Sequence, residues 1–277
     1  MPPSPPLAYV YGIVPDGSDA ELFDEAAVLP GATFGPPRLL SSDGFLAVVS
    51  DLTLNDGRSL AALVENGRDA EKLVLHHHQV LQALIARQSV LPFRLGVMFE
   101  DDRGVMGALA RNREALLYAM ERVHGAIEWG LKIYCVRQQL GQWLPDNNPA
   151  VAALDAQLES AEEGSGFFLR HRRRRLVEEE IEQAIARCLN HTGERLNSTV
   201  REFASGKLQP AQVHAREGAM VFNGACLVDR VLEQAFLELV QDLRSAYAGF
   251  GLDHEITGPW PPYSFADCQL GGDEHAA

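Results

Sequence analysis

Residues Ile127–Val136 read IEWGLKIYCV, and this stretch carries the clearest structural pattern in the chain. Apolar side chains occupy its odd-numbered positions, whereas Glu128, Gly130 and Lys132 lie between them. A period of two is the period of a β-strand, because successive side chains point to opposite faces. We therefore predict a half-buried strand here, with one face in a core and the other in water.

The residues before this strand predict a sheet with helices. Leu7–Val14 (LAYVYGIV), closed by Pro15-Asp16-Gly17, is typical of a buried strand and a turn. The expected order is a strand at Leu7–Val14, a helix at Ser18–Ala27 and a hairpin of two strands at Arg38–Ser41 and Phe45–Leu52. A helix at Asp69–Gln88 and a strand at Val90–Phe99 follow. This βαββαβ order is the ferredoxin-like arrangement, an antiparallel sheet with helices on one face. A further helix is expected over Gly104–Val123.

The residues after Val136 predict a similar strand order with long amphipathic helices. We expect a loop at Pro145–Pro149, then helices at 150–162 and 167–190 with a break at Gly164-Ser165-Gly166 between them. Weak strand candidates within 195–216 come next. They are followed by a strand at Ala219–Val228, a helix at Asp229–Phe250 and a strand at Leu252–Thr257. The fold class is therefore α+β with two domains. We place an N-terminal ferredoxin-like domain at residues 1–124 and a C-terminal domain at 125–277.

Composition and charge exclude several classes of protein. The chain has 277 residues, 46% of them hydrophobic and 22% charged, which is ordinary globular composition. Its formal charge of −14 repels phosphate backbones and anionic lipid, so we expect no nucleic-acid or membrane partner. No apolar run reaches the roughly 18 residues of a membrane span, and the N-terminus lacks signal-peptide features. Four distant cysteines indicate reduced thiols, so we expect a soluble intracellular protein.

Two polar clusters invite a metal interpretation that their geometry does not favour. His76-His77-His78 are consecutive, and helical neighbours point about 100° apart, so three in a row do not converge on one ion. His77 falls within the apolar stripe of its helix and is expected to pack there, with solvated neighbours. Glu100-Asp101-Asp102 precede a helix, where acidic residues are stabilised by the helix dipole. Because nucleophile, phosphate-loop and metal motifs are also missing, we expect no catalytic, metal or cofactor site.

The arginine run at Arg170–Arg175 has two interpretations. It is typical of a solvated helix with ion pairs at i, i+4, namely Arg174–Glu178 and Arg175–Glu179. It also fits docking on an acidic patch of a partner or of the other domain, and nucleic acid is the least favoured target.

Thr257–Phe265, TGPWPPYSF, is the most unusual segment. Three prolines hold the backbone extended and space three aromatic side chains along it. The segment either closes its own core or presents anchors to a partner. Core closure is favoured, because aromatic side chains usually fill cores.

This nonapeptide resembles the C-terminal signature of the gas vesicle accessory proteins GvpF and GvpL. Other stretches agree in order, namely YVYGIV at 9–14, LPFRLGVMF at 91–99, EWGLKIY at 128–134 and NGACLVDR at 223–230. The resemblance spans nearly the whole chain and both types share these motifs. It implies a ferredoxin-like N-terminal domain, an α/β C-terminal domain, and no catalytic residues. It also implies a minor component of gas vesicles in the cytoplasm, which contacts the hydrophobic shell protein GvpA and other Gvp proteins during vesicle nucleation.

Two hypotheses of different classes follow. The leading one is an assembly factor that covers the apolar face of shell subunits, with Trp260, Tyr263 and Arg94 as candidate partner-binding residues. The alternative is a small-molecule-binding or enzymatic α+β protein with a cleft between its domains, because one fold hosts many functions.

Overall fold

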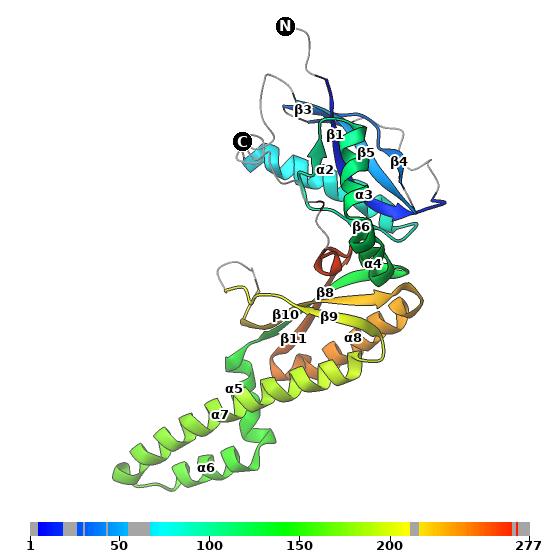
Figure 1. Cartoon of the computed structure of the whole chain (residues 1–277). Coiled ribbons are helices and arrows are strands. Elements are labelled where there is room, and N and C mark those ends of the chain that lie inside the picture. The colour runs from blue at the N-terminus through cyan, green and yellow to red at the C-terminus, as the bar shows by residue number, and fades with distance from the viewer. Residues whose placement is uncertain are drawn as a thin grey trace. The chain divides into compact units, whose positions relative to one another are not determined.

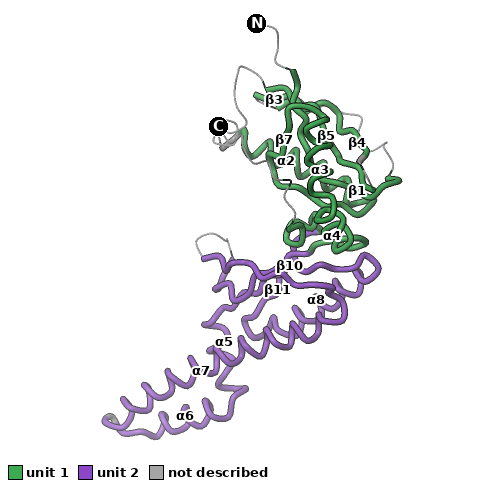
Figure 2. The backbone as a smooth tube through the Cα atoms, viewed as in Figure 1, with its two compact units in different colours: residues 1–128, 259–277 green, residues 129–258 purple. Residues whose placement is uncertain are grey.

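The computed structural model describes residues 5–18, 27–29, 31–42, 44–54, 67–210, 216–267 and 270 (Figure 1). The chain is mixed α/β and forms two compact units (Figure 2). Unit 1 comprises residues 1–128 and 259–277, and unit 2 comprises residues 129–258. Residues 259–267 thus pack with unit 1, whereas the division at residue 124 assigns them to the second domain. That division concerns independently folding domains, and it stays a prediction.

A seven-stranded antiparallel sheet forms the centre of unit 1. Its spatial order is β2-β3-β5-β1-β6, with β4 also paired to β5 and β7 to β1. The strands are β1 (Leu7–Pro15), β2 (Ala27–Leu29), β3 (Ala32–Phe34), β4 (Arg38–Ser42), β5 (Phe45–Leu54), β6 (Leu91–Pro92) and β7 (Met98–Phe99). The seven inner residues of β1 are all buried, as expected for a central strand that is apolar on both faces. The predicted first strand and the β4–β5 hairpin are confirmed.

The predicted strand Val90–Phe99 is wrong as a single element. It forms two short strands, β6 and β7, which pair separately with β1. Between them a turn at residues 95–96 interrupts the strand, and Gly96 has a left-handed φ of 93° that is unsuited to a strand. The predicted helix Ser18–Ala27 lies outside the described residues, apart from Ser18 and from Ala27, which begins β2.

The helices of unit 1 are α2 (Gly67–Ile85), α3 (Asp102–Arg111) and α4 (Arg113–Val123). The predicted α2 is confirmed, whereas the single helix over Gly104–Val123 is wrong. The chain bends at Asn112, whose backbone is not helical and whose side-chain amide donates to the Ala108 carbonyl. Asn competes with the helix in this way because its short polar side chain reaches nearby backbone groups.

Unit 2 holds a four-stranded sheet with the spatial order β11-β8-β10-β9. The strands are β8 (Ala126–Cys135), β9 (Val200–Ser205), β10 (Ala219–Asp229) and β11 (Leu252–Trp260). The helices are α5 (Arg137–Asn147), α6 (Pro149–Glu159), α7 (Glu163–Leu196) and α8 (Glu233–Tyr247), with the 3₁₀ turns η1 (Arg230–Leu232) and η2 (Ala248–Phe250) on either side of α8. Along the chain, unit 2 runs strand, helices, strand, strand, helix, strand. Gly251 ends this last helical stretch with a left-handed φ of 77°.

Two predictions about the helices of unit 2 are wrong. The loop expected at Pro145–Pro149 shrinks to Asn148, because α5 continues to Asn147. The Asn148 side chain accepts hydrogen bonds from the next helix and caps α6. The break expected at Gly164–Gly166 also lies elsewhere, since those residues form the start of α7 and the chain breaks before Glu163. Helix α7 lies beside α6, as Figure 1 shows, and packing of this kind outweighs the low helix propensity of glycine.

Strand β8 departs from the predicted wet face. The odd-numbered apolar positions are buried as expected, but Glu128 and Tyr134 on the other face are buried as well. Within the described ranges, no helix has the length and apolar character needed to cross a bilayer.

Candidate partner-binding site

The C-terminal segment TGPWPPYSF forms the end of β11 and a short 3₁₀ turn, η3 (Tyr263–Phe265). Pro261 and Pro262 are buried and Phe265 is completely buried, so the segment contributes to the core of unit 1. Trp260 is half-buried and Tyr263 remains 38% exposed. Phe265 therefore supports the interpretation that the segment closes its own core. Trp260 and Tyr263 remain at the surface, which supports the interpretation that the segment presents anchors to a partner.

Glu128 fixes this segment to β8. The backbone N–H and the hydroxyl of Ser264 each donate to one oxygen of the Glu128 carboxylate, at 2.8 Å. Burial raises the pKa of Glu128, and the two hydrogen bonds oppose that shift. The buried carboxylate thus has partners for both oxygens, which explains why an acidic residue is tolerated on the covered face of β8.

Arg122 on α4 holds the end of the same segment. Its guanidinium donates to the Phe265 carbonyl at 3.2 Å and pairs with Asp267 at 2.7 Å. It also lies 5.7 Å from the centre of the Phe265 ring, a cation–π distance. Three kinds of contact therefore position η3 before any partner is considered.

Tyr263 and Arg94 line one hollow of about 300 Å³ in unit 1. The other lining residues come from α2 and from the stretch after β6, namely Val74, His77, His78 and Leu95. Trp260 lies beside this hollow, with its ring 5.2 Å from that of His78. The structure thus brings the three sequence-selected residues to one place. The combination of aromatic rings, aliphatic side chains and one guanidinium suits a surface that binds another protein.

The three consecutive histidines of α2 point to three different partners. His76 lies 2.9 Å from the Tyr11 hydroxyl, His77 lies 2.8 Å from the Tyr9 hydroxyl, and His78 lies 3.1 Å from the Gln82 amide. This divergence is what helical geometry predicts for adjacent residues. Across the described part of the chain, no group of three or more His, Cys, Asp or Glu side chains is arranged to hold a metal ion.

His77 is the packed histidine that the sequence predicts. Its Nε2 donates to the Phe93 carbonyl at 3.2 Å, so its Nδ1 is left to accept from the Tyr9 hydroxyl. Burial lowers the pKa of His77 to about 4, and the ring is neutral at pH 7. The prediction of solvated neighbours is wrong, because His76 and His78 are half-buried.

Sequence reasoning missed His78 and Gln82 as parts of this site. The Gln82 amide donates to the Pro259 carbonyl at 2.8 Å and contacts the His78 ring at 3.1 Å. Positions 78 and 82 are one helical turn apart, which is the only sequence signal that joins them. Their contact with the C-terminal segment spans 177 residues and has no local pattern.

The acidic cluster before α3 has the structural role expected. Asp101 caps the helix by accepting from the Gly104 N–H at 2.9 Å. Asp102 pairs with Arg38 at 2.7 Å, and Arg38 also pairs with Asp51. The cluster is thus engaged in a cap and in ion pairs.

The arginine run lies on α7 and forms a different set of ion pairs from the one predicted. Arg175–Glu179 is present at 3.3 Å, but Glu178 pairs with Arg137 of α5 at 2.6 Å instead of Arg174. Arg173 pairs with Asp155 and so links α7 to α6. The pairing of Glu178 depends on tertiary packing, since its partner is 41 residues away.

Unit 2 contains a buried Cys–Thr–His cluster relevant to the enzymatic alternative. His254 Nε2 lies 2.9 Å from the Thr192 hydroxyl and 3.9 Å from the Cys188 sulfur. Burial raises the pKa of the Cys188 thiol to about 11 and lowers that of His254 to about 4. Both groups are therefore neutral at pH 7, whereas a catalytic cysteine requires the thiolate.

Comparison with known proteins identifies the family. The gas vesicle synthesis protein GvpL/GvpF family matches residues 7–267. The chain belongs to the GvpL/GvpF family. Gas vesicle protein L of Streptomyces sp. (strain CB03234) is 32% identical over 269 residues, covering 94% of this chain and 92% of that protein. Gas vesicle protein F2 of Halobacterium salinarum (strain ATCC 700922 / JCM 11081 / NRC-1) is 23% identical over 274 residues, covering 96% and 94%.

Solved structures of GvpF share the fold. The crystal structure of GvpF from Anabaena sp. PCC7120 has a TM-score of 0.68 and 19% identity, covering 95% of this chain and 99% of that one. GvpF from Microcystis aeruginosa gives 0.65 and 18%, with the same coverage. The predicted resemblance to the GvpL/GvpF family is therefore confirmed, and the protein is associated with gas vesicles.

The stretches that carry the GvpL/GvpF resemblance have clear structural positions. YVYGIV lies in the central strand β1, EWGLKIY in β8 and NGACLVD in β10. Gly12 of the first stretch is required by packing, because a Cβ there would lie 2.6 Å from the Leu91 carbonyl oxygen of β6. The resemblance thus rests on residues that build the two sheets and on the segment that ends at Phe265.

Proposed function

We propose that this chain is a gas vesicle assembly factor that binds the hydrophobic shell protein GvpA, together with other Gvp proteins, during vesicle nucleation in the cytoplasm. The observation that carries the proposal is the family match over residues 7–267. Relatives named gas vesicle protein L and gas vesicle protein F align over nearly the whole chain, which supports a role that uses both units.

The surface chemistry of the chain supports a role in covering the apolar face of a shell subunit. A subunit with a large apolar face aggregates unless another surface covers that face. This chain offers half-exposed aromatic and aliphatic side chains around the hollow of Tyr263 and Arg94, within a molecule of formal charge −14. The negative charge keeps a complex dispersed while the apolar residues make the contact.

Trp260→Ala tests the proposed contact. We expect the variant to retain about tenfold less shell protein on co-purification, because a half-buried aromatic at an interface centre is a typical binding anchor. The assay is co-expression of the full chain with GvpA, followed by measurement of the GvpA soluble fraction and of the bound amount.

Tyr118→Ala is the matched control. Tyr118 is a 73% exposed aromatic of α4 in the same unit, and it is not among the residues that line the hollow. Its removal should leave capture unchanged. Failure of the unmodified chain to retain GvpA at any salt concentration would refute direct binding. A collapse of thermal stability in Trp260→Ala would assign Trp260 to the core instead.

We infer a structural role without catalysis. The family is named for gas vesicle synthesis, and the high pKa of the Cys188 thiol does not favour a nucleophile. A thermal-shift screen of the full chain with metabolites, nucleotides and metal ions tests this inference. Saturable stabilisation by one compound would instead favour the small-molecule-binding alternative.

We also propose that the chain has two domains that fold independently, divided near residue 124, namely a ferredoxin-like N-terminal domain and a C-terminal α/β domain with long helices and a similar strand order. The strand, helices, strand, strand, helix, strand order of unit 2 supports the similar strand order of the C-terminal domain. Expression of residues 125–277 alone provides the test. A cooperative unfolding transition of that fragment would support the division, and an unfolded fragment would refute it.

A further inference from the structure

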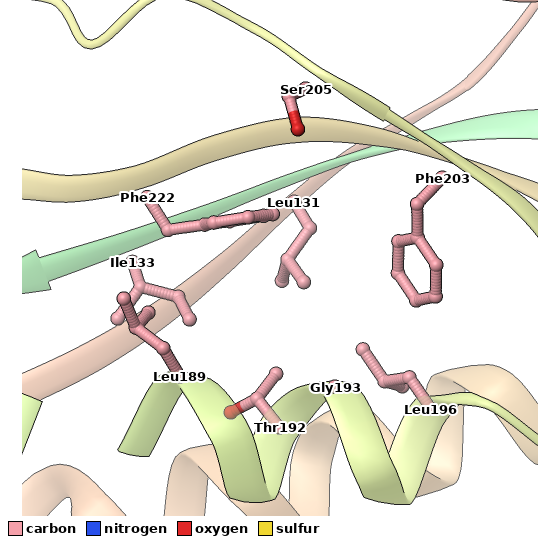
Figure 3. A pocket seen from close by; sticks show the side chains of 9 residues that line it. All are labelled: Leu131, Ile133, Leu189, Thr192, Gly193, Leu196, Phe203, Ser205 and Phe222. Carbon is pink, nitrogen blue, oxygen red and sulfur yellow. The ribbon is translucent and has the colours of Figure 1, made fainter. Parts of the chain in front are cut away.

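An apolar cavity of about 180 Å³ lies in unit 2 between α7 and the sheet (Figure 3). Strands β8, β9 and β10 supply its upper wall, and one face of α7 supplies its lower wall. Its lining residues are Leu131, Ile133, Leu189, Thr192, Gly193, Leu196, Phe203, Ser205 and Phe222. This cavity is separate from the hollow of unit 1 and contains none of the residues selected from the sequence.

The cavity has a buried apolar floor and an exposed mouth. Leu131, Ile133 and Leu196 are almost completely buried, whereas Phe203 is 40% exposed. Gly193 is exposed as well, so the opening lies between β9 and α7. An opening of this kind gives a bound group a route from solvent.

The chemistry of the lining selects an apolar occupant. Two lining side chains carry hydroxyls, and the Thr192 hydroxyl lies 2.9 Å from His254 Nε2, outside the lining. None of the described residues that line the cavity carries a charged side chain. A water molecule needs two to four polar partners, so this space favours hydrocarbon over water. Apolar cavities of about 150 Å³ accept a benzene ring, which places leucine, isoleucine and phenylalanine side chains in the right size range.

Gly193 keeps the space open. It lies inside α7, between Leu189 and Leu196 on the face that Figure 3 shows toward the sheet. A Cβ built at this position meets no atom within 4 Å. Glycine is the least favourable residue in a helix interior after proline, and no crowded neighbour here requires it. Gly193 therefore lowers the stability of α7 at the position where a larger side chain would fill the cavity.

Strand β9 indicates where the occupant comes from. It is the last strand in the order β11-β8-β10-β9, so among the described residues one of its edges carries no paired strand. Phe203 and Ser205 belong to β9 and line the mouth. An added strand would lie about 4.8 Å beyond β9, and every second side chain would point to the face that holds the cavity.

We propose that this cavity receives one bulky apolar side chain from a shell-protein segment that pairs with the edge of β9 where the described structure places no strand. The proposal rests on the proposed function, because the occupant is the hydrophobic partner named there. It adds a second contact surface, on unit 2, with a defined chemistry of an extended backbone and one aliphatic or aromatic side chain.

Gly193→Leu in the full chain tests the proposal. The new side chain should occupy the cavity, and the helix should remain folded because leucine favours helix more than glycine. Gly164→Leu is the matched control, since it adds the same side chain to the same helix at a position where a Cβ also meets no atom within 4 Å. It lies 29 residues earlier, about 40 Å along a straight helix.

Two measurements separate the cavity from the partner. Toluene serves as the apolar probe, and it should raise the melting temperature of the unmodified chain and of Gly164→Leu but not of Gly193→Leu. Co-purification with co-expressed GvpA should fall about tenfold for Gly193→Leu alone.

Each other outcome contradicts a stated part of the proposal. A toluene effect that persists in Gly193→Leu, or that is missing from the unmodified chain, would show that this space takes no apolar group. Equal GvpA retention by the unmodified chain and Gly193→Leu would overturn the side-chain insertion while leaving the proposed function intact. No retention by the unmodified chain would refute the proposed function and, with it, this choice of occupant, whatever toluene does.

Discussion

The hollow of unit 1 and the cavity of unit 2 differ in how the chain's own side chains occupy the surrounding space. In unit 1 the chain's own side chains fill the core, because Phe265 is completely buried and His77, which lines the hollow, has partners on both ring nitrogens. In unit 2 the chain leaves space, because Gly193 contributes no side chain between α7 and the sheet. The comparison teaches that the two proposed binding surfaces differ in kind, because one is a rim of aromatic and charged groups and the other is an unfilled apolar cavity.

The buried histidines show the same contrast at the level of single atoms. His77 in unit 1 is hydrogen-bonded through Nδ1 and Nε2. His254 in unit 2 contacts Thr192 through Nε2, and within the described structure its buried Nδ1 has no hydrogen-bond partner. A buried polar atom without a partner is destabilising, so the ring of His254 is less completely satisfied than that of His77.

The largest expected effect is that of removing the core aromatic of unit 1. Phe265→Ala should lower the free energy of unfolding by about 3–5 kcal/mol, because a large buried ring is replaced by a cavity. Tyr263→Ala, two residues earlier and 38% exposed, should cost less than about 1.5 kcal/mol. Urea unfolding at pH 7 measures both. Equal losses would remove the distinction between a filled core and an exposed rim.

Acid should weaken both units through the two histidines. Each has a folded-state pKa of about 4, below the 6.5 of an exposed ring. As the pH falls below 6.5, the unfolded chain takes up protons first, so stability declines and the loss levels off below pH 4. From pH 7 to pH 5 each histidine should contribute a loss of about 2 kcal/mol.

Variants separate the two contributions. His254→Gln should reduce the pH 7-to-5 decline in the free energy of unfolding, and His77→Gln should do the same for unit 1. The measurement is urea unfolding at both pH values for each variant. A decline of full size in His254→Gln would mean that its ring is not held neutral in the folded state.

The smallest expected effect tests whether the cavity tolerates a methyl group. Gly193→Ala should raise the free energy of unfolding by about 0.5–1 kcal/mol, because it adds helix propensity where nothing lies within 4 Å. Gly12→Ala is the contrasting change, since a Cβ there would lie 2.6 Å from a backbone oxygen, and it should destabilise unit 1. Thermal unfolding of the two variants measures both signs. A destabilised Gly193→Ala would show that α7 and the sheet are closer than this structure places them.

The sequence alone determined the elements whose patterns are local. A continuous apolar run specified β1, alternation specified the buried face of β8, and helical periodicity specified α2 and the packed position of His77. The nonapeptide ending at Phe265 and the shorter stretches were enough to identify the family. These features depend on neighbours within a few residues, so the spacing of apolar residues along the sequence predicts them directly.

Only the tertiary structure decided the contacts between distant residues. Glu128 meets Ser264 across 136 residues, and Glu178 pairs with Arg137 instead of the arginine one turn away. Packing also decided that α7 runs through Gly164, and it alone revealed the space beside Gly193. The physical reason is that burial, ion pairing and cavity formation depend on which surfaces meet in space, and residues far apart in the sequence supply those surfaces.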